Sequence, residues 1–172
     1  MSETRSMIDT YVAQAIQEHE LSLLGYVKSL LKGDVATSEE VVMFAFAQLY
    51  KQVAEGKVDK IRNLRSWLLT VCRNRVAELA RSGRIAQTFD PSTWDTMDET
   101  PNACELQQNQ EDQERLANCM DKLSPAQREI VRLKIWEKLK YDEIAEILDI
   151  TANNAGVRMH NALRDLRKCF GK

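Results

Sequence analysis

The sequence predicts an all-α protein in which two small helical domains are joined by an acidic linker. Apolar residues recur at three- and four-residue spacing in long segments separated by turn residues, which is the helical period. The 172 residues include only six glycines and three prolines. Charge changes along the chain: residues 37–86 carry nine basic and five acidic side chains, whereas residues 87–120 carry one and eight. We therefore expect domains at residues 1–86 and 121–172, with residues 87–120 as the linker.

The first domain is expected to contain three helices. The first spans about residues 9–32 and ends at Gly33-Asp34, because glycine and aspartate commonly terminate helices. The second spans about residues 38–53 and is apolar on nearly every side, so it is either a core helix or one that also offers a partner surface. A polar loop at residues 54–63 precedes a third helix at about residues 64–81.

Arginines are concentrated in and around this third helix. Their fork-shaped guanidinium groups suit phosphate oxygens. No acidic residue lies between Asp59 and Glu78, so we expect local ion pairing to leave these arginines unneutralised. The alternative is an ordinary solvated face. The residues concerned are Arg62, Arg65, Arg73, Arg75, Arg81 and Arg84.

The second domain has the pattern of a helix-turn-helix. Ser124-Pro125 is a helix start, a second helix should begin near Tyr141, and the polar break at residues 149–151 places Thr151 as the cap of a third helix. The second helix of such a motif enters the DNA major groove, where Asn pairs with adenine and Arg with guanine or phosphate. A plain three-helix bundle with a solvated polar face is the alternative. The outward polar residues are Asn153, Asn154, Arg158, Asn161 and Arg164.

Several function classes are disfavoured by the composition. Neither the four cysteines nor His19 and His160 have metal-site spacing, and no carboxylate cluster or phosphate loop occurs, so we expect no metal, no cofactor and no enzyme activity. Cys72, Cys104, Cys119 and Cys169 are expected to be small core residues, with a Cys104–Cys119 thiol switch as an alternative. No membrane span or signal-peptide core appears, which predicts a cytoplasmic protein.

Both halves resemble the small two-domain sigma factors of bacterial RNA polymerase, the extracytoplasmic-function (ECF) group of the sigma-70 family. Residues 123–129, 141–148 and 157–167 resemble the minus-35 binding domain, known as sigma region 4. Residues 67–75 resemble the helix of sigma region 2 that reads and melts the minus-10 element. Residues 38–50 resemble the helix that docks on the polymerase clamp.

The resemblance implies core RNA polymerase and promoter DNA as partners, with roles for individual residues. Residues 54–63 would hold an extruded base. The minus-35 duplex would be contacted by Tyr141, Asn153, Asn154, Arg158, His160 and Asn161, and the minus-10 strand by Arg62, Asn63, Arg65, Arg73 and Asn74. Core polymerase would be contacted by Glu39, Glu40, Met43 and Phe44.

The chain departs from the family pattern at several positions. Thr37 stands where an acidic residue is usual, and Met43 and Phe44 replace polar residues. Phosphorylation of Thr37 or Ser38 by a Ser/Thr kinase would restore the charge, whereas a hydroxyl at a helix N-cap is the plain alternative. Control by an anti-sigma factor is a second implication of the resemblance. Gly156, where a basic residue is common, lowers helix stability by about 1 kcal/mol relative to alanine.

Two other functions fit the same sequence. A transcriptional regulator would use the helix-turn-helix without polymerase, and a degenerate sigma-like module would bind a regulator through its apolar N-terminal helices.

Overall fold

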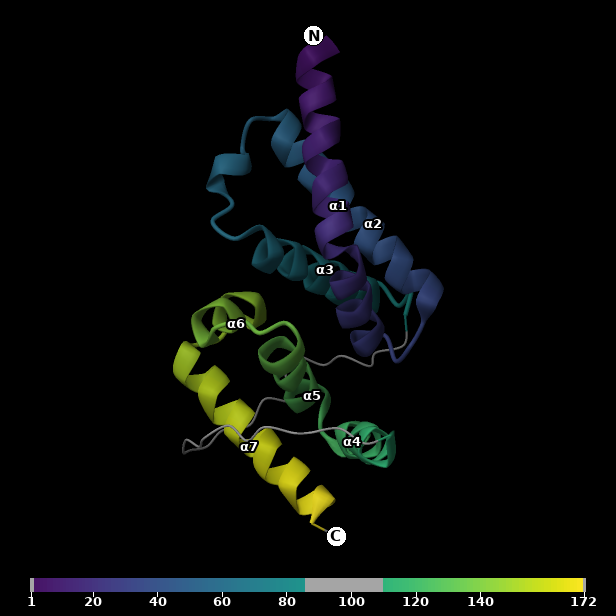
Figure 1. Cartoon of the computed structure of the whole chain (residues 1–172), viewed down its shortest axis with the longest axis vertical. Coiled ribbons are helices and arrows are strands. Elements are labelled where there is room, and N and C mark those ends of the chain that lie inside the picture. Colours follow the sequence, from purple (N-terminus) through teal and green to yellow (C-terminus); the bar gives the residue numbers. More distant parts are fainter. Residues whose placement is uncertain (1, 86–109, 172) are drawn as a thin grey trace. The chain divides into compact units, whose positions relative to one another are not determined.

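The computed structural model describes residues 2–85 and 110–171. Within these two ranges the backbone forms helices and no strand (Figure 1). The chain divides into two compact units, Met1–Phe89 and Asp90–Lys172. The all-α fold is therefore confirmed.

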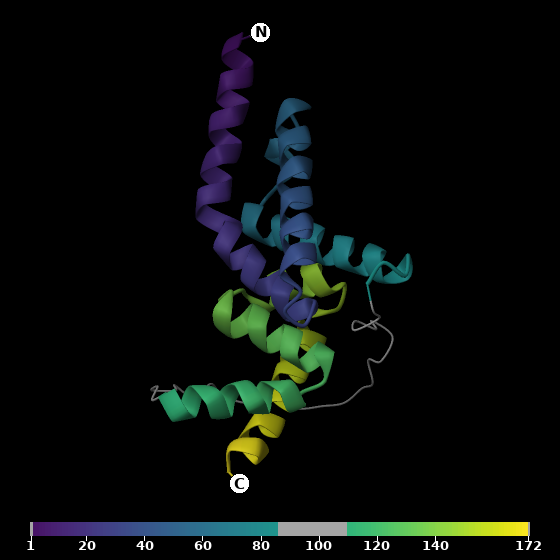
Figure 2. The same cartoon turned by 90° about the vertical axis from the view of Figure 1, so that its right-hand side faces the viewer.

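The first unit packs three long helices around one core. These are α1 (Ser2–Leu30), α2 (Val35–Ala54) and α3 (Leu64–Arg81), with a short 3₁₀ turn, η1 (Val58–Lys60), before α3. Helix α1 packs along α2, and both contact α3 (Figure 2). Tyr26, Leu49 and Leu68 are fully buried at their contacts. The apolar spacing of the sequence thus produces one continuous core.

Helix α2 begins earlier than the sequence pattern predicts. Lys32 and Gly33 have positive φ angles of 52° and 89°, which reverse the chain after α1. Asp34 is the N-cap, and its carboxylate accepts a hydrogen bond from the Thr37 backbone N–H at 3.1 Å. Aspartate is among the best capping residues because it satisfies an N–H that has no partner inside the helix. The aspartate we expected to end one helix therefore starts the next.

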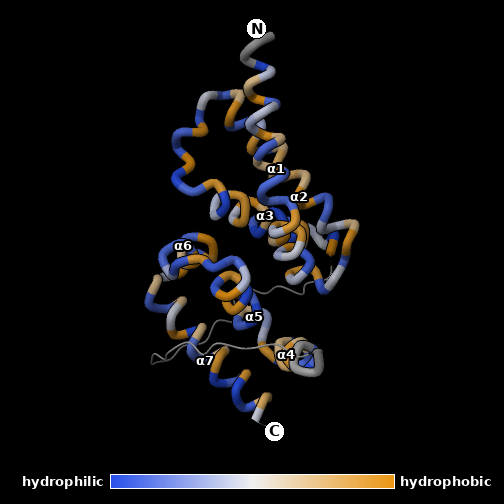
Figure 3. Tube along the Cα trace, in the orientation of Figure 1, coloured by the Kyte–Doolittle hydropathy of each residue, from blue (hydrophilic) through white to orange (hydrophobic). Residues whose placement is uncertain are grey.

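The second unit consists of α4 (Gln110–Lys122), α5 (Pro125–Val131), the π-helical segment η2 (Arg132–Trp136), α6 (Tyr141–Leu148) and α7 (Ala152–Phe170). Figure 3 shows hydrophobic and hydrophilic residues alternating along these helices. Ile144 and Met159 contribute to the buried side, at 0% and 3% exposure. Helix α7 packs against α4, α5 and α6, so it is the central element of this unit.

The predicted helix starts in this unit are confirmed by the capping geometry. Ser124 caps α5 reciprocally with Gln127, and Pro125 is the first helical residue. Thr151 caps α7 by accepting from the Asn154 backbone N–H at 3.1 Å. Asp149 ends α6 with a φ angle of 54°. The short turn between α6 and α7 is therefore fixed by the side chains at its two ends.

Part of the predicted linker belongs to the second unit. Residues 110–120 lie in helix α4, so the boundary we placed at residue 121 falls inside this helix. Cys119 of α4 is joined by a disulfide to Cys169 of α7. Cys72 is a buried free thiol, as expected of a core residue. Cys104 lies outside the described residues, and the alternative pairing of Cys104 with Cys119 is wrong in this structure because Cys119 is bonded to Cys169.

Candidate nucleic-acid and polymerase interfaces

Three of the six candidate DNA-binding residues of the second unit share one face of α7. A helix turns about 100° per residue, so Asn153, His160 and Asn161 fall within an arc of about 100°. Ala155, Met159, Ala162 and Leu166 form the buried stripe on the other side. Asn153 at the start of the helix is exposed, and its first turn is anchored by the Thr151 cap. The face is therefore set by local helix geometry.

Arg158 lies beside the buried stripe of α7, and its Nη1 atom is fully buried, as are the His160 Nδ1 and Asn161 Oδ1 atoms. The Arg158 side chain as a whole is only partly exposed. Because a guanidinium group binds DNA through its outward nitrogens, only part of this one is available to a ligand. Arg158 therefore contributes to packing, and only its exposed part is available to bind DNA.

Tyr141 occupies the first position of α6, between two nearby lysines and the Asp142 and Glu143 carboxylates of the first turn. The Lys134 ammonium lies 4.5 Å from the centre of the Tyr141 ring. The same Nζ donates to the backbone carbonyl of Leu139 at 3.0 Å. Lys140, the N-cap residue, is exposed. The Glu143 carboxylate accepts from the Lys140 backbone N–H at 2.8 Å, so a DNA phosphate at this helix start would rely on the Tyr141 hydroxyl and the two lysine side chains.

The candidate minus-10 residues of α3 do not form one surface. Arg62 and Asn63 are exposed at its start, where Asn63 caps the helix by accepting from the Ser66 N–H at 3.1 Å. Arg65 is half-buried, and its Nη2 donates to Ser22 of α1 at 3.3 Å. Asn74 lies nine residues after Arg65, or two and a half turns, and so points from the opposite side of the helix.

Arg73 and Asn74 are neighbours in sequence with different surroundings. Arg73 is buried at 8% exposure, whereas Asn74 is exposed. A buried guanidinium group contributes to the packing of the unit and cannot face a DNA strand without rearrangement. Of these two candidates, Asn74 is therefore the one placed for contact with a ligand.

Asn74 lies in a groove between α2 and α3 with a volume of about 870 Å³. Trp67, Val71 and Glu78 recur at helical spacing along the same side of α3. Trp67, Val71 and Glu78 were not among the residues expected to bind DNA, and their helical spacing is the signal that could have indicated a shared groove. The lining residues are Phe44, Gln48, Trp67, Val71, Asn74, Arg75, Glu78, Arg81 and Ser82.

The candidate polymerase-binding residues lie on the outer side of α2. Glu39 and Glu40 are exposed, and Met43 is 66% exposed. Phe44 is partly covered, because the Arg75 guanidinium lies 4.6 Å from the centre of its ring. An exposed methionine beside two carboxylates forms a mixed apolar and acidic surface, which differs from the buried side of the same helix.

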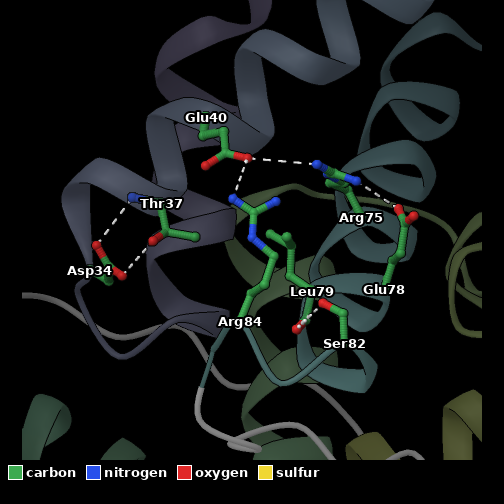
Figure 4. A network of polar contacts seen from close by, with 8 residues as sticks. All are labelled: Asp34, Thr37, Glu40, Arg75, Glu78, Leu79, Ser82 and Arg84. Carbon is green, nitrogen blue, oxygen red and sulfur yellow. Dashed lines mark hydrogen bonds and ion pairs between the residues drawn. The ribbon is translucent and has the colours of Figure 1, made fainter.

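Ion pairs connect this surface to α3, contrary to the expectation that the arginines lack acidic partners. Arg75 pairs with Glu78 at 2.9 Å and with Glu40 at 3.6 Å, and Arg84 pairs with Glu40 at 3.6 Å (Figure 4). The expectation was wrong for Arg75, which pairs locally with Glu78 and across to Glu40 of α2, and for Arg84, which pairs with Glu40. Glu40 and Arg84 are 48% and 57% exposed, so water weakens their attraction.

The two hydroxyl groups considered for phosphorylation are not equally accessible. Ser38 is fully buried, and its hydroxyl donates to the Asp34 carbonyl. Thr37 is partly exposed, and its hydroxyl donates to the Asp34 carboxylate at 2.6 Å. This bond and the one from the Thr37 backbone N–H lower the pKa of Asp34. Thr37 lies inside α2, so the alternative that it is the N-cap is wrong.

Among the described residues, no group of three or more His, Cys, Asp or Glu side chains could hold a metal ion. None of the helices described is long and apolar enough to cross a membrane.

Comparisons with known proteins agree with this architecture. A family model described as sigma-70, region 4 matches residues 113–166. The chain is 28% identical over 150 residues to the ECF RNA polymerase sigma factor SigK of Mycolicibacterium vanbaalenii, covering 86% of this chain and 75% of that protein. It is 26% identical over 154 residues to the ECF RNA polymerase sigma factor SigL of Mycobacterium tuberculosis, covering 90% and 86%.

A solved structure has the same fold. It is the sigma factor RpoE in complex with the anti-sigma factor NepR from Bartonella quintana, with a TM-score of 0.63 and 20% sequence identity. The match covers 92% of this chain and 96% of the RpoE chain.

Proposed function

From the membership of this chain in the ECF sigma factors of bacterial RNA polymerase, we propose that it directs promoter-specific initiation by reading two promoter elements. The first unit binds core polymerase and the minus-10 element, and the second unit binds the minus-35 element. The single observation that carries the proposal is the helix-turn-helix of α6 and α7 inside the segment matched by sigma-70 region 4.

The minus-35 element is proposed to be read by α7 in the major groove. Asn153 offers an amide that can form a pair of hydrogen bonds with an adenine edge. Tyr141 and the adjacent lysines would hold a phosphate at the start of α6. Phosphate contacts position such a domain on the duplex, whereas base contacts specify the sequence. The exposure of Asn153 and the cap at Thr151 support this division of labour.

The minus-10 element is proposed to be read on the Asn74 side of α3, with loop residues 54–63 holding an extruded base. Trp67 gives the groove an aromatic ring on which a base can stack, and Arg81 gives it a phosphate partner. Arg62 and Asn63 belong to this loop, and Arg65 follows it in the first turn of α3. Arg73 is proposed to act through the packing of α3, because it is buried.

Core polymerase is proposed to dock on the outer side of α2. Glu39 and Glu40 supply negative charge, and Met43 and Phe44 supply apolar surface. Charge complementarity across such an interface steers association and fixes its register. Because Arg75 and Arg84 already pair with Glu40, these ion pairs must open or be shared when a basic partner binds.

Phosphorylation of Thr37 is proposed as one way to control this docking. Thr37 lies one helical turn before Glu40, so a phosphate there would compete for Arg84. It would also repel the Asp34 carboxylate that now accepts the Thr37 hydroxyl. Thr37→Ala should then lose transcription in the native cell, while Thr10→Ala, which changes an exposed threonine of α1, should not. Wild-type transcription by Thr37→Ala would rule out this control.

Control by an anti-sigma factor is the second regulatory proposal. The related RpoE fold was solved with the anti-sigma factor NepR, and the exposed Met43 offers apolar surface on α2. This second form of control is tested by a pull-down of the chain with a co-encoded inhibitor. We expect Met43→Glu to lose this binding.

The proposal is tested by run-off transcription with purified core polymerase on genomic fragments, with and without the chain. We expect new, discrete start sites that depend on the chain. A chain that never associates with polymerase but binds operator DNA as a dimer would support the regulator alternative. If the chain binds neither polymerase nor operator DNA, the remaining alternative is the sigma-like interaction module. Its binding to a regulator should tolerate Asn74→Ala and Asn153→Ala.

A further inference from the structure

A disulfide in the second unit joins two segments that are distant in sequence. Cys119 lies near the end of α4 and Cys169 in the last turn of α7; they are 50 residues apart in sequence, and their Cα atoms are 5.8 Å apart. If the proposed function is correct, the chain works beside RNA polymerase, where cellular dithiols keep most thiols reduced. A disulfide in such a compartment is usually redox-sensing or catalytic.

The two sulfur atoms have different surroundings. Cys119 is buried at 5% exposure, whereas Cys169 is partly exposed. The Lys122 ammonium lies 3.7 Å from the Cys169 Sγ. A nearby cation stabilises a thiolate, and a stabilised thiolate is a better leaving group in disulfide exchange. The Cys169 sulfur is therefore accessible to an attacking thiolate. The Lys122 ammonium stabilises the Cys169 thiolate when it leaves.

The polar contacts that Arg115 of α4 makes with Phe170 of α7 are exposed. The Arg115 Nη2 donates to the Phe170 carbonyl at 3.1 Å, and the Arg115 guanidinium lies 5.4 Å from the centre of the Phe170 ring. Exposed polar contacts of this kind stabilise only weakly. The covalent link is therefore the strongest single tie between these two helix ends, and its loss should loosen α4 from α7.

We propose that Cys119–Cys169 is a reversible redox site, reduced by a thioredoxin-class dithiol, whose state sets how tightly α4 is held on the proposed recognition helix α7. A reductant thiolate attacks the exposed Cys169 sulfur, which forms a mixed disulfide and releases the Cys119 thiolate. The second reductant thiol then attacks its own sulfur in the mixed disulfide and releases the Cys169 thiolate beside Lys122. Two electrons pass to the protein, and the reductant becomes a disulfide.

The test uses the full oxidised chain with thioredoxin, its reductase and NADPH, followed by alkylation and mass mapping of all four cysteines. We expect Cys119 and Cys169 to become labelled without denaturant. Cys72 should remain unlabelled while the chain is folded, because burial raises its pKa to about 12. Amide exchange in residues 114–122 should rise by about tenfold or more on reduction.

Two lysine variants test the role of the ammonium group. Lys122→Gln should slow reduction several-fold, because the Cys169 thiolate then leaves without a nearby cation. Lys168→Gln changes an exposed lysine adjacent to Cys169 in sequence and should leave the rate within about twofold of wild type. Equal slowing in both variants would contradict the role of Lys122.

Other outcomes would overturn the redox site itself. A disulfide that opens only after unfolding would be a permanent staple, and unchanged amide exchange after reduction would contradict control of α4. Run-off transcription on the same samples separates this inference from the proposed function. If the chain initiates transcription equally in both redox states and α4 is unaffected, the redox site is wrong and the sigma function stands.

Discussion

The two units of the chain present their candidate DNA-binding residues in different ways. In the second unit Asn153, His160 and Asn161 share one face of α7, because a single capped helix carries all three. In the first unit Arg65 and Asn74 lie on opposite sides of α3, and Arg75 is engaged by Glu40 of α2. The binding face is thus set by helix periodicity in one unit and by packing between helices in the other.

The largest effect should come from breaking the core behind the α7 face. Ile144 is fully buried, so Ile144→Ala should destabilise the second unit by about 2–5 kcal/mol. Amide exchange should rise throughout α6 and α7 and stay unchanged in α2. Ile135→Ala, at a side chain 49% exposed, is the control and should have little effect. Loosening of both units by Ile144→Ala would show that they do not fold independently.

Two single substitutions in α3 test whether the buried Arg73 and the exposed Asn74 have different roles. Arg73→Ala should lower stability by about 1–3 kcal/mol, because it removes a buried polar group from its partners. Asn74→Ala should leave the melting temperature unchanged and reduce initiation. Melting curves and run-off assays on both variants check this. A stable Arg73→Ala protein that fails to initiate would restore Arg73 as a DNA contact.

The α7 face should be sensitive to the loss of one amide. Asn153→Ala should reduce discrimination at one minus-35 base pair by about 1–3 kcal/mol, which is the range for a well-placed bidentate contact. Competition binding of the polymerase complex to single-base promoter variants measures this. Asn118→Ala, at an exposed asparagine of α4, should bind like wild type. Unchanged base preference in Asn153→Ala would contradict the orientation of α7.

Two glycines, one in each unit, should respond in opposite ways to replacement by alanine because their backbone conformations differ. Gly156 lies inside α7, and no atom outside the helix backbone lies within 4 Å of an added Cβ. Gly156→Ala should therefore stabilise the second unit by about 1 kcal/mol. Gly83 has a φ of +72°, so Gly83→Ala should destabilise the first unit instead. Thermal unfolding checks both, and a lower melting temperature for Gly156→Ala would contradict the open space beside it.

The smallest effect concerns His19 on α1. Burial lowers its pKa below 6.5, with the Glu18 carboxylate acting in the opposite direction. The unfolded chain therefore binds the proton more readily, so stability is highest above pH 6.5 and falls as pH drops through the folded-state pKa. His19→Gln should flatten this part of the melting temperature profile. An identical profile in wild type and variant would assign the dependence to other groups.

The features that the sequence predicted well are local ones. The caps at Ser124 and Thr151 and the start of α3 at Leu64 follow from residue types next to each other in the chain. The missed features depend on contacts distant in sequence. Glu40 reaches Arg75 of α3 and Arg84 beyond its end only because α2 and α3 pack together. The pairing of Cys119 with Cys169 spans 50 residues, so spacing alone does not reveal it.

The most direct test of the two-element account uses a promoter found by run-off transcription. Initiation is measured for wild type, Asn74→Ala and Asn153→Ala on templates altered in the minus-10 or the minus-35 element. The account predicts that Asn153→Ala becomes indifferent to minus-35 changes but remains sensitive to minus-10 changes, and that Asn74→Ala does the reverse. Loss of sensitivity to the same element in both variants would contradict the assignment of one promoter element to each unit.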